Sequence, residues 1–345
     1  MSVMLEEIYQ QPAAVSNVLE HESSNWARLA EELRSKDIQH VLIAARGTSD
    51  NAATYAKYLI EIVCGIPVTL AAPSVFTLYG ASLKLHKTLA IGISQSGQGT
   101  DVVQTLASAR QSGALTACIT NVEDSPLTRV SDHVFLCHAG VERAVAATKT
   151  YTTSLANVAL LAAHWADHAL LKQEIARLPQ LIQEAIGEDH AIASAVERYR
   201  YIQECAVLAR GLNQCTALEA ALKMTETSYL VAKPYSGADF LHGPVAMVTN
   251  GFPVFMYMPD GSTYSMMLDL ARRLKDQGTE LIIVANNAEA LQLAHTPVRI
   301  PAAVHELVSP LVAIVPGQML ACHLAVSRGA DPDSPRGLSK VTLTR

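Results

Sequence analysis

Short apolar runs alternate with amphipathic stretches along most of the chain. Before this pattern begins, residues 1–35 carry apolar side chains at helical spacing and predict N-terminal helices. The runs expected to form strands come next, at 40–45, 68–71, 89–93, 116–121 and 134–137, and a long helix follows the last of them. Strands that alternate with helices predict a mostly parallel, doubly wound α/β sheet.

The same pattern restarts after residues 166–200, a helical stretch with polar patches that we interpret as a linker. Strands are expected to begin at Ala206, Val254 and Leu281, with an amphipathic helix over 218–230. The expected organisation is N-terminal helices (1–35), a first α/β domain (36–165), a helical linker (166–200), a second α/β domain (201–328) and a C-terminal tail (329–345).

The two halves align with each other as an internal repeat. Residues 45–47 match 209–211 at an offset of 164, and at the same offset residues 89–94 fall on 253–258. Two copies of one α/β unit explain these matches most simply.

One strand-to-helix turn, Ser94-Gln95-Ser96-Gly97, is rich in small hydroxyls and glycine. Backbone N–H groups, hydroxyls and a helix N-terminus in such a turn can surround a phosphate. The alternative is an ordinary turn that uses Ser and Gly for capping. The second copy has Met-Pro-Asp-Gly at 258–261, where an acid and a proline suit phosphate poorly, so this fold does not require the serines.

Composition narrows the class of protein. The chain has 345 residues, of which 50% are hydrophobic and 5% aromatic, and a net charge of −6. This profile is typical of well-buried, two-domain globular chains, and it excludes disorder and a basic nucleic-acid-binding surface. No signal peptide is apparent, and Pro310, Pro316 and Gly317 interrupt the uncharged stretch 307–326. A buried loop and helix is therefore expected there, with no membrane span.

The six cysteines have neither paired nor metal-ligand spacing, and no metal site or cofactor is expected. We interpret them as reduced and structural, which fits the cytoplasm. They are Cys64, Cys118, Cys137, Cys205, Cys215 and Cys322.

Six blocks in one order resemble the sugar isomerase (SIS) phosphosugar-binding family. They are RGTS at 46–49, SQSG at 94–97, AATKTYTT at 146–153, LEAALKMTETSY at 218–229, DFLHGP at 239–244 and DPDSPRGLSKVTLT at 331–344, with EIYQQP near the start. The chain looks similar to the isomerase half of glucosamine-6-phosphate synthases, which is a tandem pair of such domains. Because it opens Met1-Ser2, without the near-terminal cysteine of the glutaminase domain, it most resembles stand-alone SIS-type glucosamine-6-phosphate deaminases.

The resemblance implies that Ser94, Gln95 and Ser96 hold the sugar phosphate. Gly99 stands where the synthase has a phosphate-binding threonine, which makes Thr100 the candidate for that contact. Ala147 replaces a serine, so one hydroxyl contact is expected to be lost. The other implied substrate-binding residues are Gly47, Thr48, Ser49, Gly97, Val145, Ala146, Glu219 and Ser339.

The resemblance also implies that Glu226 is the catalytic base. Aldose–ketose interconversion moves a proton between C1 and C2, and one carboxylate can take it and return it. Glu219, Lys223 and Glu226 share one helix face by their spacing, and the resemblance brings Lys223 into the catalytic set. The alternative for these residues is a solvated salt-bridge stripe worth a few tenths of a kcal/mol, roughly.

His242 and Lys340 complete the implied catalytic set. His242 lies before Gly-Pro, where a histidine is commonly a hydrogen-bonded loop residue. The resemblance implies instead that His242 opens the sugar ring, and that it does so in the active site of the partner subunit of a homodimer. Lys340 near the chain end is ordinarily a solvated charge. The resemblance implies a tail over the substrate, with Lys340 forming a Schiff base or stabilising developing negative charge.

The expected function is therefore conversion of glucosamine 6-phosphate and water to fructose 6-phosphate and ammonia. Related phosphosugar isomerisation, galactosamine-6-phosphate deamination and fructosamine-6-phosphate deglycation are enzymatic alternatives. A non-catalytic sugar-phosphate sensor is an alternative of another class. The presence of Glu226, His242 and Lys340 argues against it, because binding a phosphate requires none of them.

Overall fold

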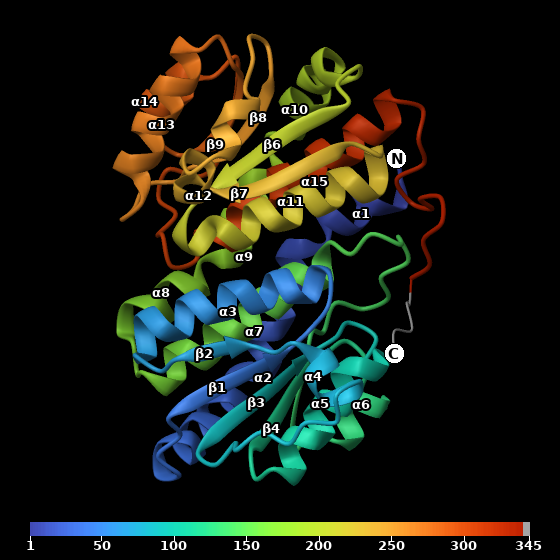
Figure 1. The fold of residues 1–345 in the computed structure, drawn as a ribbon, viewed down its shortest axis with the longest axis vertical. Helices are drawn as coiled ribbons and strands as arrows, with labels where there is room; N and C mark the ends of the chain where they lie inside the picture. The colour runs from blue at the N-terminus through green and yellow to red at the C-terminus, as the bar shows by residue number, and fades with distance from the viewer. Residues whose placement is uncertain (341–345) are drawn as a thin grey trace. The chain divides into compact units, whose positions relative to one another are not determined.

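The computed structural model describes residues 1–340, and it contains two parallel five-stranded sheets, each in its own compact unit (Figure 1). The first unit comprises Ala13–Glu142 and Lys149–Ala176, together with Ser339 and Lys340 of the tail. The second unit comprises Met1–Pro12, Arg143–Thr148 and Arg177–Leu338. The expected fold class, two tandem doubly wound α/β domains, is confirmed.

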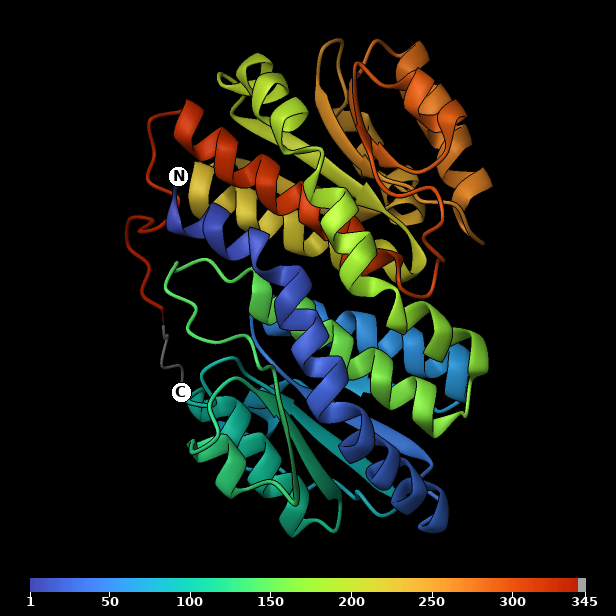
Figure 2. The ribbon, with the colours of Figure 1, turned by 180° about the vertical axis from the view of Figure 1, so that it is seen from behind.

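The sheet of the first unit has the strand order β2-β1-β3-β4-β5, with every pair parallel. Helices α2, α3 and α7 lie on one face of the sheet, and α4, α5 and α6 lie on the other (Figures 1 and 2). The strands are β1 (His40–Ala44), β2 (Val68–Leu70), β3 (Thr88–Ile93), β4 (Leu115–Thr120) and β5 (His133–Leu136). The helices are α2 (Gln11–Ser35), α3 (Thr48–Cys64), α4 (Pro73–Thr77), α5 (Thr100–Gln111), α6 (Pro126–Arg129), α7 (Lys149–Trp165) and α8 (Ala169–Ala176).

The sheet of the second unit has the strand order β10-β9-β8-β6-β7, again parallel throughout. Helices α11 and α15 pack on one face of this sheet, whereas α12, α13 and α14 pack on the other. The strands are β6 (Glu204–Ala209), β7 (Val231–Ser236), β8 (Pro253–Tyr257), β9 (Glu280–Ala285) and β10 (Thr296–Arg299). The helices are α1 (Val3–Tyr9), α9 (Leu178–Ile186), α10 (Asp189–Ala195), α11 (Gln214–Ser228), α12 (Gly237–Leu241), α13 (Tyr264–Asp276), α14 (Ala288–Leu293) and α15 (Ser309–Ser327), with short 3-10 turns η1 (Val196–Tyr199), η2 (Gly211–Asn213) and η3 (Pro244–Met247).

The internal repeat is present in the topology. Read from β7, the second sheet runs β7-β6-β8-β9-β10, which is the order of the first sheet with each strand replaced by its counterpart. The matched stretches 89–94 and 253–258 correspond to β3 and β8, the central strands of the two sheets. The turns that follow these strands therefore occupy equivalent places in the two units.

The sequence pattern missed two strands, β7 and β10, and both lie at an edge of the second sheet. Each contains a proline, Pro234 in β7 and Pro297 in β10. A proline cannot donate to a neighbouring strand and is tolerated at a sheet edge, but it weakens the sequence signal for a strand. Half-exposed edges also lack the continuous apolar run that identified the central strands.

The uncharged stretch near the C-terminal end forms α15, a core helix. Its length and mean hydropathy of 1.5 would allow it to cross a membrane. However, 89% of the apolar 18-residue stretch of this helix is buried inside the protein, as expected for a core helix. At Gly317 an added Cβ would lie 2.4 Å from the Tyr257 hydroxyl and 3.3 Å from Ala220 Cβ, so glycine permits the close approach of α15 to α11.

All six cysteines are free thiols, and five of them are buried. Burial raises the pKa of the Cys118 thiol to about 11 and that of the Cys64 thiol to about 12. A thiol is unreactive at neutral pH with such a pKa, because the thiolate is the nucleophile. The interpretation of these cysteines as reduced and structural agrees with their environment.

Candidate functional site

The Ser94–Gly97 turn joins β3 to α5 at the carboxyl end of the first sheet. Backbone bonds fix it on the adjoining strand β4: Ser94 N–H donates to Ile119 O (3.1 Å), and Asn121 N–H donates to Gln95 O (3.0 Å). Gly97 N–H closes the turn on Ser94 O at 3.1 Å. The main chain of the turn is therefore held by the sheet rather than by its own side chains.

Several hydrogen-bond donors of this turn have no partner among the described residues. Within residues 1–340, the Ser94 hydroxyl and the N–H groups of Gln95 and Ser96 make no hydrogen bond, although all three residues are half-buried. The Ser96 oxygen accepts the N–H of Gln98 at 3.2 Å, which leaves its proton available to a ligand. Half-buried hydrogen-bond donors without partners are typical of a site that binds an anion.

Gly97 and Gly99 offer a matched test of this turn. Gly97 has φ +63°, and an added Cβ would lie 2.1 Å from Ser125 Oγ; Gly99 has φ −56°, and its added Cβ would meet nothing nearer than 3.7 Å. A non-glycine residue in the left-handed region costs about 1–3 kcal/mol, and the added methyl group would also collide with Ser125, so Gly97→Ala should displace the turn and its free donors. Binding of the probe fructose 6-phosphate should therefore weaken at least about 10-fold. Gly99→Ala should change it less than about 3-fold. Calorimetric titration of both variants checks this, and equal affinities would contradict the assignment of this turn as a phosphate site.

The equivalent turn of the second unit already holds an anion, the carboxylate of Glu306. Ser262 donates to it through its N–H (2.7 Å) and its hydroxyl (3.0 Å). An added Cβ at Gly261 would lie 2.3 Å from Glu306 Oε2, so the carboxylate fills the turn. The repeat therefore carries one turn with free donors and one in which the chain supplies its own anion.

The turn after β1 lies beside the Ser94–Gly97 turn, because β1 and β3 are parallel neighbours. Gly47 precedes α3 with φ +54°, and Thr48 and Ser49 begin that helix. Arg46 Nε donates to Asp101 Oδ2 at 2.6 Å, which joins this turn to the first turn of α5. The structure thus brings together the predicted substrate-binding residues of the first unit other than Ser339, namely Gly47, Thr48, Ser49, Ser94, Gln95, Ser96, Gly97 and Thr100.

The charged residues of α11 form a compact cluster in the second unit. Lys223 Nζ lies 2.6 Å from Glu226 Oε2 and 3.4 Å from Glu219 Oε1. Lys223 and Glu219 are fully buried, with 1% and 0% of their side chains exposed, whereas Glu226 is 23% exposed. A solvated salt-bridge stripe is therefore excluded; two charges are held in the interior and one carboxylate remains within reach of a ligand.

His242 follows α12 in the second unit and is exposed. Its N–H donates to Asp239 O (3.1 Å), but its ring makes no hydrogen bond to another described residue. The alternative of a hydrogen-bonded loop histidine therefore does not apply to the imidazole. In the described part of the chain, no group of three or more His, Cys, Asp or Glu residues is arranged to hold a metal ion.

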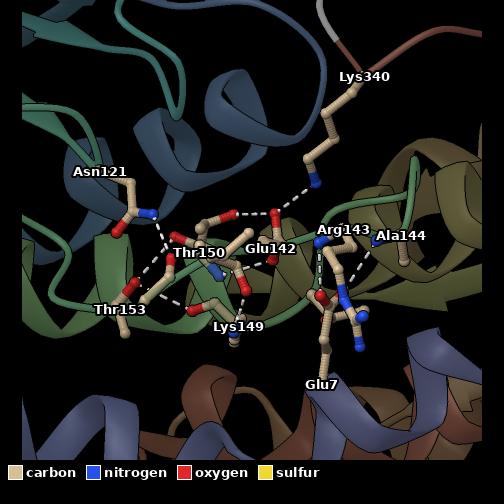
Figure 3. A network of polar contacts seen from close by, with 12 residues as sticks. Glu7, Asn121, Glu142, Arg143, Ala144, Lys149, Thr150, Thr153 and Lys340 are labelled. Carbon is tan, nitrogen blue, oxygen red and sulfur yellow. Dashed lines mark hydrogen bonds and ion pairs between the residues drawn. The ribbon is translucent and has the colours of Figure 1, made fainter.

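Lys340 makes an ion pair in the first unit that the sequence did not indicate. Its Nζ lies 2.7 Å from Glu142 Oε2, and the Glu142 side chain is completely buried (Figure 3). Thr150 also binds this carboxylate, through its N–H (3.1 Å) and its hydroxyl (2.8 Å). Lys340 of the tail is thus paired with a buried anion, and Ser339 precedes it. Residues 341–345, which include the end of the tail motif, lie outside the described residues.

Glu7 anchors a loop of the second unit. Its carboxylate accepts the N–H of Arg143 (2.5 Å) and of Ala144 (3.2 Å), and Asp333 O accepts the N–H of Val145 (3.2 Å). These bonds fix the backbone up to Val145, the first of the three predicted sugar-lining residues Val145, Ala146 and Ala147. Sequence reasoning assigned no role to Glu7 or Glu142. The signal available for Glu7 was its place at the start of the EIYQQP block, whereas Glu142 stands next to Arg143 and had no signal of its own.

The comparisons with known proteins agree with this geometry. The model of the SIS domain family matches residues 32–164 and 203–328, which include both sheets. The chain belongs to the SIS domain family. The C-terminal domain of glucosamine-fructose-6-phosphate aminotransferase from Francisella tularensis has a similar structure, with a TM-score of 0.89, 30% identity and coverage of 97% of this chain and 98% of that one. The glucosamine-6-phosphate deaminase of Thermotoga maritima shares the fold, with a TM-score of 0.79, 24% identity and coverage of 99% and 100%.

Curated relatives support the same family assignment. The glutamine–fructose-6-phosphate aminotransferase (isomerizing) of Thermococcus kodakarensis is 35% identical over 347 residues, an alignment that covers 98% of this chain and 57% of the relative. This SIS chain therefore spans little more than half the length of that relative, and it resembles the isomerase domain of such enzymes.

Proposed function

We propose that this SIS protein is a phosphosugar deaminase that converts glucosamine 6-phosphate and water into fructose 6-phosphate and ammonia. Glu226 takes the proton from C2 of the open-chain aldehyde and returns it to C1, which produces an imine at C2. Water adds to this imine, ammonia leaves, and the ketone of fructose 6-phosphate remains.

The other roles follow the family resemblance. Ser94, Gln95 and Ser96 hold the phosphate, with Thr100 supplying the contact for which Gly99 has no side chain. His242 transfers the proton that opens and closes the ring. Lys340 stabilises negative charge as the proton moves, or forms a Schiff base with the open ketose.

The observation that carries an enzymatic proposal is the cluster on α11. Burying an ion pair costs several kcal/mol per ion, roughly, unless the geometry repays it, and binding a phosphate does not require one. Here the buried Lys223 fixes a partly exposed carboxylate, Glu226, at 2.6 Å. A protein that only binds a sugar phosphate, without converting it, does not need a carboxylate held as a base.

We further propose a cytoplasmic homodimer in which His242 acts in the active site of the partner subunit. Its exposed imidazole, without a hydrogen bond to any other described residue, suits a side chain that functions outside its own subunit.

The proposal is tested by measuring ammonia release from purified protein with glucosamine 6-phosphate, galactosamine 6-phosphate and a fructosamine 6-phosphate. Release from glucosamine 6-phosphate supports the proposed reaction, and preferential release from another member of the panel selects the corresponding alternative. Tight binding of phosphosugars without any turnover would identify a sensor and would overturn the enzymatic proposal.

A further inference from the structure

Arg46 is an exposed cation beside the Ser94–Gly97 turn. Its side chain is 56% exposed, and its Nε donates to Asp101 Oδ2 at 2.6 Å, whereas the Asp101 side chain is 1% exposed. Neither Nη1 nor Nη2 of Arg46 makes a hydrogen bond to another described residue. One edge of the guanidinium is therefore fixed by a buried carboxylate, and four N–H groups remain free for a ligand.

The negative charge of Asp101 disfavours phosphate binding unless a cation balances it. It lies in the first turn of α5, where its Oδ1 accepts the N–H of Val102 at 2.9 Å. A Cβ placed on Gly99 would lie 3.7 Å from Asp101 Oδ1 and 3.9 Å from Ser94 Oγ, so this carboxylate and this hydroxyl flank the same small space. An unbalanced carboxylate there would repel a phosphate dianion.

The turn itself supplies only neutral donors. Ser94, Ser96 and Thr100 offer hydroxyls, Gly99 offers no side chain, and the chain carries a net charge of −6. Among the described residues, Arg46 is the one cation hydrogen-bonded to any residue from 94 to 101. A guanidinium matches phosphate geometry, because two parallel N–H groups can bind two oxygens.

We propose that Arg46 is the cation of the phosphate site, and that it confers preference for phosphorylated over unphosphorylated sugars. It balances the charge of Asp101 and donates its Nη N–H groups to the phosphoryl oxygens. Arg46 thereby adds a charged contact to the neutral contacts of Ser94, Ser96 and Thr100. This inference rests on the proposed function, because it assumes a phosphorylated sugar as the ligand.

The test is calorimetric titration with fructose 6-phosphate and with fructose in ammonium-free buffer, where no deamination or amination takes place. Arg46→Gln should weaken binding of fructose 6-phosphate at least about 30-fold and change that of fructose less than about 2-fold, as expected for loss of one charge-assisted, bidentate contact. Arg46→Lys should recover part of the affinity, because the charge returns without the fork of donors. The double variant Arg46→Gln, Asp101→Asn should bind more tightly than Arg46→Gln, yet less tightly than the wild type.

Arg110→Gln is the matched control. Arg110 lies at the other end of α5 and pairs with Asp132 at 2.6 Å, the same distance as in the Arg46–Asp101 pair. This variant should bind both ligands as the wild type does. Retained fructose binding and thermal midpoint in Arg46→Gln would show that the site is folded.

Three results would overturn the inference while leaving the proposed function intact: Arg46→Gln binds fructose 6-phosphate like the wild type, it loses both ligands equally, or the double variant regains full wild-type affinity. In the last case Arg46 only balances Asp101 and does not contact the phosphate. Failure of the wild type itself to prefer fructose 6-phosphate over fructose would instead overturn the proposed function, and the inference with it.

Discussion

Glu226→Gln is expected to lower kcat for ammonia release from glucosamine 6-phosphate by about 10²–10⁴-fold, the usual contribution of a general base. Binding of fructose 6-phosphate should change less than about 2-fold, because the isosteric amide removes the proton acceptor and no phosphate contact. The carboxylate is 23% exposed and lies 2.6 Å from Lys223 Nζ, so a glutamine oxygen can keep that hydrogen bond and the fold. Steady-state kinetics and calorimetric titration measure the two quantities.

Glu289→Gln is the control for this variant. Glu289 also pairs with a cation in the second unit, Arg272 at 2.5 Å, but it is 56% exposed on α14. Its replacement should leave kcat unchanged. Turnover of Glu226→Gln within about 10-fold of the wild type would contradict the assignment of Glu226 as the base.

Lys223→Met is expected to produce the largest loss of stability. It removes the ammonium that faces the fully buried Glu219 carboxylate at 3.4 Å, and breaking a buried pair in this way costs about 3–5 kcal/mol. For a unit of this size that corresponds to a fall of roughly 6–20 °C in the thermal midpoint. Differential scanning calorimetry follows the transition of the second unit.

Two further variants locate the cause of this loss. Lys275→Met removes an exposed lysine from α13 of the same unit and should change the midpoint by no more than about 2 °C. Lys223→Met combined with Glu219→Gln should recover part of the loss, because the buried charge is gone. If Lys223→Met is no more destabilising than Lys275→Met, the cluster on α11 is not the buried network described above.

The central strands and the repeat could be predicted from sequence because burial on both faces leaves continuous apolar runs. β3 and β8 are buried along their whole length, and their alignment at a fixed offset revealed the duplication. Edge strands β7 and β10 could not be found in this way, because each contains a proline and exposed positions that interrupt the apolar run. The spacing of Glu219, Lys223 and Glu226 was sufficient to place them on one helix face, but not to show that two of them are buried.

Partners of charged groups from distant segments were not predictable. Glu142 and Lys340 are 198 positions apart, and Arg46 and Asp101 are 55 apart, so only the folded chain reveals these pairs. Composition and spacing identify residues able to carry a charge, whereas tertiary packing decides which of them is buried and against what. The carboxylate of Glu306 in the second turn is a further case, because it reaches that turn from 44 positions away.

The most direct test of the central claim is to incubate the purified protein with glucosamine 6-phosphate in D₂O and follow the products by NMR. The proposed reaction predicts ammonium and fructose 6-phosphate in equal amounts, with deuterium introduced at C1 to the extent that the carboxylate exchanges with solvent between the two proton transfers. Glucosamine 6-phosphate that binds tightly but stays unchanged, with protium retained at C2, would contradict the account.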